Sequence, residues 1–189
     1  MLLSVDEQGG QCWAKHLREI LCKTGFGDVW YFQGVGNEKV FLKIFKQRVI
    51  DMYVQEWTEA VTNSERHEKY FQMKQTFDRE NYLCNIDRFY FRSCFSKARF
   101  GMLPLKGNLN RFEKDFKSKV CPFCKNVLED ENHFLLKCPT YEELRLKFLK
   151  NCMHLPFHVI MATRSRKRGR EIANFLYFAL EKRGKLLER

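Results

Sequence analysis

The chain has 189 residues, of which 44% are hydrophobic and 15% aromatic. That much apolar material argues against a disordered chain and is enough for one domain or two small ones. The formal net charge of +11 favours polyanionic partners, with nucleic acid ahead of acidic membrane surfaces.

The chain shows no sign of membrane insertion or secretion. It has no run of eighteen apolar residues, and the opening MLLSVDEQGG lacks the basic and apolar parts of a signal peptide. We therefore expect no membrane partner and an intracellular location, in the nucleus, the cytoplasm or both. In a reducing compartment, cysteines clustered with a histidine favour metal binding over disulfides.

The first predicted helix covers residues 11–23, where apolar side chains have helical spacing and Gly25 follows as a stop. The next stretch, GFGDVWYFQGVGNE, is rich in glycine and in large aromatic residues. We expect a turn here, held in place by Phe26, Trp30 and Phe32.

The longest periodic segment predicts a helix from Asn37, as the N-cap residue, to about Asn63. Further helices are expected over residues 65–77 and 87–100, the latter ending before Gly101. An irregular link follows.

Two more helices are expected beyond the Cys/His segment. One covers residues 140–152, with Thr140 as N-cap and Glu143 at the capping-box position. The last covers residues 170–189. Since no useful alternating strand is present, the sequence predicts an all-α protein with an embedded Cys3His zinc knuckle.

The expected domain organisation has two regions that can pack as one unit. Residues 1–86 form an N-terminal helical region. Residues 87–189 contain an Arg-rich helix, the zinc knuckle and the C-terminal helices.

The segment CPFCKNVLEDENHFLLKCP carries Cys121, Cys124, His133 and Cys138 with the spacing C-x2-C-x8-H-x4-C. Two thiolates from one tight turn can reach the same metal ion. On an ideal helix, two residues five apart point about 140° away from each other. Pro139 resolves this for His133 and Cys138, because the residue before a proline is pushed out of helical geometry and can turn back.

We interpret this segment as a structural zinc site. Three Cys and one His are the composition of closed sites, whereas a catalytic zinc keeps a position for water. The alternative is a set of buried thiols with a hydrogen-bonded histidine. The acidic turn Glu129, Asp130 and Glu131 is interpreted as helix capping by Asp130 and a solvated charge cluster.

The basic stretch RSRKRGR holds five cations in seven positions, and Gly169 suggests that it is mobile. It predicts a nucleic-acid contact or a nuclear-localisation patch, with a solvated charge run as the alternative. Its cations are Arg164, Arg166, Lys167, Arg168 and Arg170.

The helix predicted over residues 87–100 adds a second basic feature. Arg88, Arg92 and Arg99 recur along one face, with Lys97 at its edge. We expect these cations to lie on phosphates while Tyr90 offers a ring for base stacking.

Enzyme signatures are missing from the sequence. It contains no G-x-S-x-G, P-loop, H-E-x-x-H or deaminase motif and no Tyr-x-Asp-Asp loop. We therefore expect a protein that is not an enzyme.

The order of these segments resembles the region after the polymerase in reverse transcriptases of non-LTR (LINE-type) retrotransposons. The matching stretches include GFGDVWYFQGVGN, FKQRVIDMYVQEW, NSERHEKYFQMK, FSKARFGMLPLKGNLNRF and, most specifically, CPFCKNVLEDENHFLLKCPTYEELRLKFL. The polymerase and endonuclease are absent, and Met1 falls at a point that is interior in the family. We therefore expect a truncated or co-opted copy of this region.

The resemblance implies a zinc-stabilised module that holds RNA or DNA during target-primed copying. It implies that Cys121, Cys124, His133 and Cys138 bind zinc, and that backbone contacts come from Arg92, Lys97, Arg99 and Arg111. The alternative function is a protein-interaction scaffold in which zinc staples the helices and nucleic acid is not bound.

Overall fold

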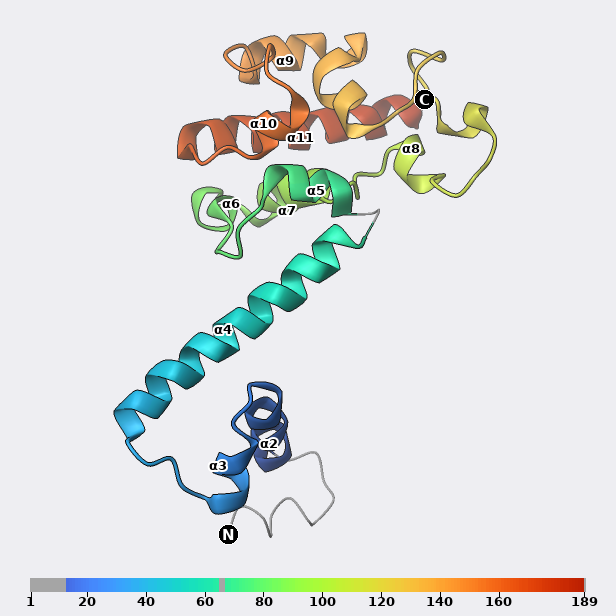
Figure 1. The fold of residues 1–189 in the computed structure, drawn as a ribbon. Coiled ribbons are helices and arrows are strands. Elements are labelled where there is room, and N and C mark those ends of the chain that lie inside the picture. Colours follow the sequence, from blue (N-terminus) through green and yellow to red (C-terminus); the bar gives the residue numbers. More distant parts are fainter. Residues whose placement is uncertain (1–12, 65–66, 189) are drawn as a thin grey trace. The chain divides into compact units, whose positions relative to one another are not determined.

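The computed structural model describes residues 13–64 and 67–188. These residues form helices and no strand, with one isolated antiparallel bridge between Val120 and Leu128. The prediction of an all-α fold is confirmed. The chain divides into two compact units, Met1–Ala60 and Val61–Arg189, which are described separately (Figure 1).

The division between the units lies earlier in the chain than the boundary expected after residue 86. Tyr82 and Ile86 belong to the same buried cluster as Phe95. The segment before residue 87 is therefore part of the second unit, because its apolar side chains complete that unit's core.

Among the described residues of the first unit, three helices begin: α2 (Trp13–Lys23), α3 (Gly27–Phe32) and α4 (Glu38–Thr62). The helix expected over residues 11–23 is confirmed from Trp13 onward, while residues 11 and 12 lie outside the described residues. Gly25 follows with a φ of 82°, a left-handed conformation that suits glycine at a helix end.

Helix α3 stands where an aromatic turn was expected. Trp30 is 2% exposed and joins Ala14 and Leu21 in a small core. Phe26 packs edge-on against Phe41, with 5.3 Å between ring centroids, whereas Phe32 is 81% exposed. Burial of Trp30 stabilises a helical turn that local glycine content alone disfavours.

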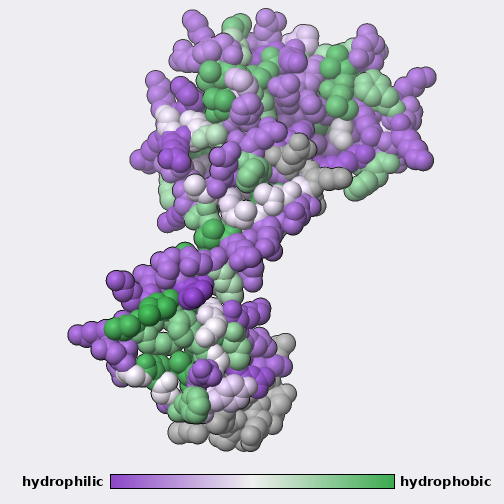
Figure 2. Space-filling view, viewed as in Figure 1, coloured by the Kyte–Doolittle hydropathy of each residue, from purple (hydrophilic) through white to green (hydrophobic). Residues whose placement is uncertain are grey.

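Helix α4 begins where the sequence predicted. The side-chain Oδ1 of Asn37 accepts a hydrogen bond from the Val40 N–H at 3.2 Å, so Asn37 is the N-cap. Many large apolar side chains of α4 are exposed, among them Leu42 and Ile44. Figure 2 shows apolar side chains gathered on the surface of the first unit.

The second unit is built around α11. Its elements in chain order are α5 (Glu68–Met73), α6 (Asn81–Asn85), α7 (Phe89–Arg99), α8 (Lys106–Leu109), the 3-10 turn η2 (Phe116–Lys119), the π-helical η3 (His133–Lys137), the 3-10 turn η4 (Pro139–Tyr141), α9 (Glu142–Phe148), α10 (Phe157–Met161) and α11 (Arg166–Leu187). Helix α11 packs against α6, α7 and α9 (Figure 1). Phe95, Phe134 and Phe175 are fully buried in the shared core. Across the described residues, no helix combines the length and the apolar content needed to cross a membrane.

The helices expected over residues 65–77 and 87–100 correspond to α5 and α7, while residues 65 and 66 lie outside the described residues. Helix α5 is shorter than expected, because Lys74 already has an extended conformation. Gly101, with a φ of 61°, follows the end of α7 as predicted.

The helix expected to begin at Thr140 has a different start. Turn η4 precedes α9, and Tyr141 occupies the N-cap position without a side-chain cap. The predicted capping box with Glu143 is therefore wrong. Tyr141 is 1% exposed, so burial of its ring decides how this helix begins.

Residues 166–170 of the basic stretch form the start of α11, where an irregular, mobile segment was expected. Ser165 caps the helix, since its Oγ accepts a hydrogen bond from the Arg168 N–H at 3.3 Å. Gly169 is buried inside the first turns. The stretch is therefore held in helical geometry.

Candidate metal centre

The four residues singled out in the Cys/His segment converge on one point. One ligand atom from each of Cys121, Cys124, His133 and Cys138 lies within 4.8 Å of the others. The Sγ of Cys138 is 3.9 Å from that of Cys121 and 3.7 Å from that of Cys124. The group can hold one metal ion.

The first two ligands come from a tight turn. The Lys125 N–H donates to the Cys121 carbonyl at 2.8 Å, and Lys125 has a φ of 62°. The Cys121 N–H donates to the Val127 carbonyl at 2.8 Å, beside the bridge between Val120 and Leu128. This pairing closes the turn and directs both thiols to the same side.

The last two ligands are joined by a π-helical turn. The Asp130 carboxylate accepts a hydrogen bond from the His133 N–H at 2.7 Å, which confirms the predicted cap. The Cys138 N–H then donates to the His133 carbonyl at 2.8 Å. Because this bond spans five residues, the turn places Cys138 over His133, which an α-helix would not do.

Cys138 also leaves the helix as predicted. Its φ of −65° and ψ of 121° are extended, as expected for a residue before Pro139. The proline effect was anticipated from the sequence. The π-helical winding was not, and both contribute to bringing the last two ligands together.

Burial perturbs the pKa values of three of the four residues that converge. Burial raises the pKa of the Cys121 thiol, which hydrogen bonds from the Cys124 and Phe123 N–H groups oppose. Burial, followed by the hydrogen bond with Cys138, raises the pKa of Cys124 to about 12. Burial lowers the pKa of His133, and neither of its ring nitrogens has a hydrogen-bond partner. A bound cation would satisfy these atoms, and its binding would release thiol protons.

A buried arginine supports the ligand loop. Arg145 of α9 is 5% exposed and donates a hydrogen bond to the Cys138 carbonyl. The ring of Tyr141 packs against Phe134, with 4.7 Å between centroids. Arg145 was not singled out from the sequence. The available signal was its spacing of four residues from both Tyr141 and Leu149, which are buried on the same side of the helix.

The acidic turn was expected to be a solvated charge cluster. This prediction is wrong for two of its carboxylates, because Glu129 and Glu131 are each 1% exposed. The Glu129 carboxylate accepts two hydrogen bonds from Arg183 of α11, at 3.0 and 2.8 Å. It also accepts one from the Lys106 N–H of α8, at 2.7 Å. Glu129 therefore ties the metal segment to two helices.

Glu131 makes a second connection. Its carboxylate pairs with the ammonium of Lys69 at 3.3 Å and accepts a hydrogen bond from Asn108. Lys69 belongs to α5 and Asn108 to α8. The two glutamates thus position the metal segment against three helices, and the amino-acid sequence carries no clear signal for this.

Gly107 is expected to be sensitive to substitution because α8 approaches the metal segment closely. A Cβ atom at Gly107 would lie 2.6 Å from the Glu129 carbonyl oxygen. Gly107→Ala should therefore lower the free energy of unfolding by about 1–3 kcal/mol. A Cβ at Gly184 meets nothing within 4 Å, so Gly184→Ala in α11 is the matched control and should be neutral or stabilising. Urea denaturation of both variants would measure this, and equal stabilities would contradict the close approach.

The Arg stripe expected along one face of α7 does not face solvent as a whole. Arg99 is 4% exposed, pairs with Glu80 at 3.2 Å and donates to the Met161 carbonyl at 3.2 Å. Arg92 is half-buried and donates to carbonyls at the end of α6. These two guanidinium groups hold the fold together, because the face that carries them is turned toward the core.

Arg88 and the start of α11 come together around Asp87. Arg170 bonds to the Asp87 carboxylate and to the Asn85 carbonyl, and Arg166 approaches Asp87 at 3.8 Å. Arg88, beside Asp87 in the chain, is exposed and lies over the Phe91 ring. Three predicted cations therefore lie close together.

The remaining predicted cations are distributed elsewhere. Lys97 and Lys167 are exposed. Arg111 donates to the Gly101 carbonyl at 3.3 Å. Arg164 lines the same pocket as Asp78, and Arg168 is close enough to Cys152 for its charge to oppose burial, which raises the pKa of that thiol. The ten predicted residues thus do not form one continuous surface.

Comparison of the chain with protein-family models, with curated proteins and with solved structures found no match. The candidate site is therefore defined by its own geometry.

Proposed function

We propose that the chain is a non-enzymatic nucleic-acid-binding module whose fold depends on one structural zinc ion. In this respect it would act like the region after the polymerase of a LINE-type reverse transcriptase. The observation that carries the proposal is the convergence of three thiols and one imidazole on one point.

The spacing of the sulfurs supports zinc. Two sulfurs bound to one tetrahedral zinc at about 2.3 Å lie about 3.8 Å from each other. The separations of 3.9 and 3.7 Å from Cys138 agree with this value. Four protein ligands fill a tetrahedral ion and leave no position for an activated water, which favours a structural role.

Exposed cations and aromatic rings at the N-terminal ends of α7 and α11 support nucleic-acid binding. We define the basic aromatic surface as Arg88, Phe89, Tyr90, Arg166, Lys167 and Arg170. Phe89 and Tyr90 are 67% and 71% exposed, so their rings are accessible to a partner beside the cations. Cations that follow a backbone beside rings that stack on bases are the usual means of binding single strands.

Asp87 does not cancel this charge. It is a single carboxylate among four cations, and both it and Arg166 are 63% exposed. Exposed ion pairs contribute little, so phosphates can replace Asp87 at little cost.

The test is binding of zinc-loaded protein to a fluorescent single-stranded oligonucleotide at several salt concentrations. Replacing Arg88, Arg166 and Lys167 together with Ala should weaken binding. It should also reduce the slope of log K against log salt by about 2, at about 0.7 for each phosphate contact with a single strand. Tyr90→Ala should weaken binding by about tenfold.

The matched control replaces three exposed lysines of α4, Lys39, Lys43 and Lys46, with Ala. It removes the same charge from another helix and should change binding less. The proposal would be wrong if the zinc-loaded protein showed no salt-sensitive binding, or if both triple variants bound equally well.

A further inference from the structure

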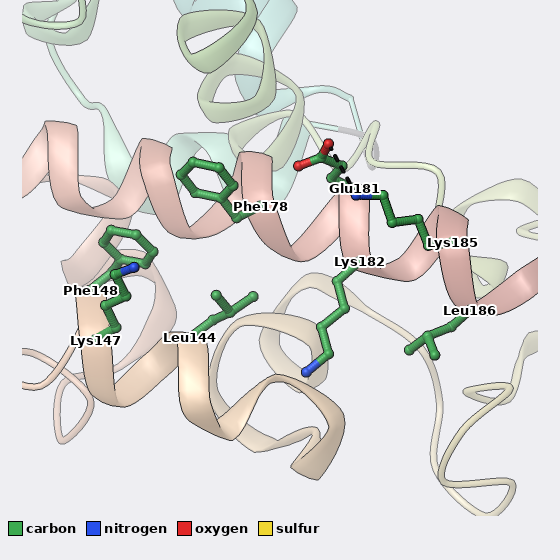
Figure 3. Close-up of a pocket in the computed structure, with 8 residues that line it drawn as sticks. All are labelled: Leu144, Lys147, Phe148, Phe178, Glu181, Lys182, Lys185 and Leu186. Atoms are coloured by element: carbon green, nitrogen blue, oxygen red, sulfur yellow. Dashed lines mark ion pairs between the residues drawn. The ribbon is translucent and has the colours of Figure 1, made fainter.

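A second surface of the second unit, far in sequence from the start of α7, is a groove between α9 and α11. It encloses a volume of about 350 Å³. Leu144 and Phe148 line it from α9, and Phe178 and Leu186 line it from α11 (Figure 3). None of these residues belongs to the metal centre or to the basic aromatic surface.

The floor of the groove is apolar. Phe148 and Phe178 stack on each other, with ring centroids 5.8 Å apart and planes 6° from parallel. Phe178 remains 39% exposed. Because the two rings pack against each other and the ammonium of Lys147 lies 5.3 Å from the Phe148 ring centroid, the floor offers apolar area more than free ring faces for bases.

The rim of the groove is basic. Lys147, Lys182 and Lys185 line it, and the carboxylate present, that of Glu181, is 3.5 Å from the ammonium of Lys185 (Figure 3). Lys185 is exposed in spite of this pair. Three cations against one carboxylate leave a positive rim over an apolar floor.

The length of the groove matches a helix. Phe178 and Leu186 are eight residues apart on α11, which is about 12 Å along the helix axis. Apolar anchors at positions i, i+4 and i+7 of a bound helix span about 10 Å. Helices that bind in grooves use such anchors.

We propose that this groove binds an amphipathic helix of a partner protein, with leucine-like anchors on the floor and acidic side chains against the three lysines. Charge complementarity favours an acidic partner, and the apolar floor favours a peptide over a nucleic acid. The inference is independent of nucleic-acid binding, which uses other residues.

The experiment measures fluorescence anisotropy of a labelled peptide of about 14 residues with zinc-loaded full-length protein. The peptide carries Leu at positions i, i+4 and i+7 and mainly Glu elsewhere. The control peptide has the same composition with the leucines scrambled. The patterned peptide should bind at least tenfold more tightly than the scrambled one.

Two charge-reversal variants localise the binding. Lys147→Glu with Lys182→Glu should weaken peptide binding by at least tenfold. Lys114→Glu with Lys117→Glu makes the same change of net charge at exposed lysines outside the groove and should leave it within about twofold. Circular dichroism checks that both variants are folded.

Three outcomes would overturn the inference: equal binding of both peptides, equal effects of the two double variants, or displacement of the peptide by a single-stranded oligonucleotide. Loss of oligonucleotide binding in the variant with Ala at Arg88, Arg166 and Lys167, with peptide binding intact, would show that the two surfaces act separately.

Discussion

Cys138→Ser is expected to abolish the binding of one zinc ion and to unfold the second unit at room temperature. A structural zinc contributes about 10 kcal/mol or more to folding, which is comparable to the whole stability of a typical domain. Cys121 and Cys138 belong to the same buried cluster as Phe134 and Phe175. Loss of the ion would leave the unpartnered nitrogens of His133 buried in that cluster.

The measurement combines zinc stoichiometry by native mass spectrometry with thermal melting followed by circular dichroism. Cys84→Ser is the matched control, because Cys84 is exposed and outside the ligand set. A chelator should lower the melting temperature of this control and of the wild type but not of Cys138→Ser. If Cys138→Ser keeps one zinc ion and melts with the control, Cys138 is not a ligand.

Glu129→Gln is expected to cost about 3–5 kcal/mol of unfolding free energy, because it leaves a buried charge without its partner. The side chains of Glu129 and Arg183 are 1% and 9% exposed. Burial acts to lower the pKa of Arg183, but the hydrogen bonds and charge of Glu129 outweigh it and raise that pKa. The substitution removes that effect of Glu129, but a guanidinium has so high a pKa of its own that Arg183 stays charged.

A double-mutant cycle identifies the source of this cost. Adding Arg183→Met to Glu129→Gln should recover part of the lost stability, since removal of both charges leaves none unpaired. Glu181→Gln is the control. It removes a carboxylate from an exposed pair with Lys185 and should cost less than about 1 kcal/mol. Urea denaturation gives the free energies. If Glu129→Gln and Glu181→Gln lower the free energy of unfolding by the same amount, the buried ion pair does not stabilise the attachment of the metal segment to α11.

The convergence of the candidate metal ligands could be predicted from the sequence because their spacing restricts which atoms can meet. Cys121 and Cys124 share one turn, Asp130 caps the next helix, and Pro139 ends it. All of these are interactions between near neighbours in the chain. The π-helical winding of η3 was not predicted, since the hydrogen bond from the Cys138 N–H to the His133 carbonyl is specific to this packing.

The helices α2, α4, α7 and α11 could also be recognised from apolar periodicity. Their boundaries were predicted well where a local cap decides them, as at Asn37. Prediction failed at α3 and at the start of α9, because burial of Trp30 and Tyr141 decides those turns. Such burial depends on residues distant in the chain.

By itself, the sequence determined which four residues could hold a metal ion, the all-α class and the basic balance of this protein. Only the tertiary structure decided which charges face solvent. Arg99, Arg145 and Arg183 are buried, whereas Arg88 and Arg166 are exposed. The physical reason is that an arginine is stable in the interior only where carboxylates or carbonyls from other segments meet it, as Glu129 meets Arg183. Only the folded chain brings these groups from different segments into contact.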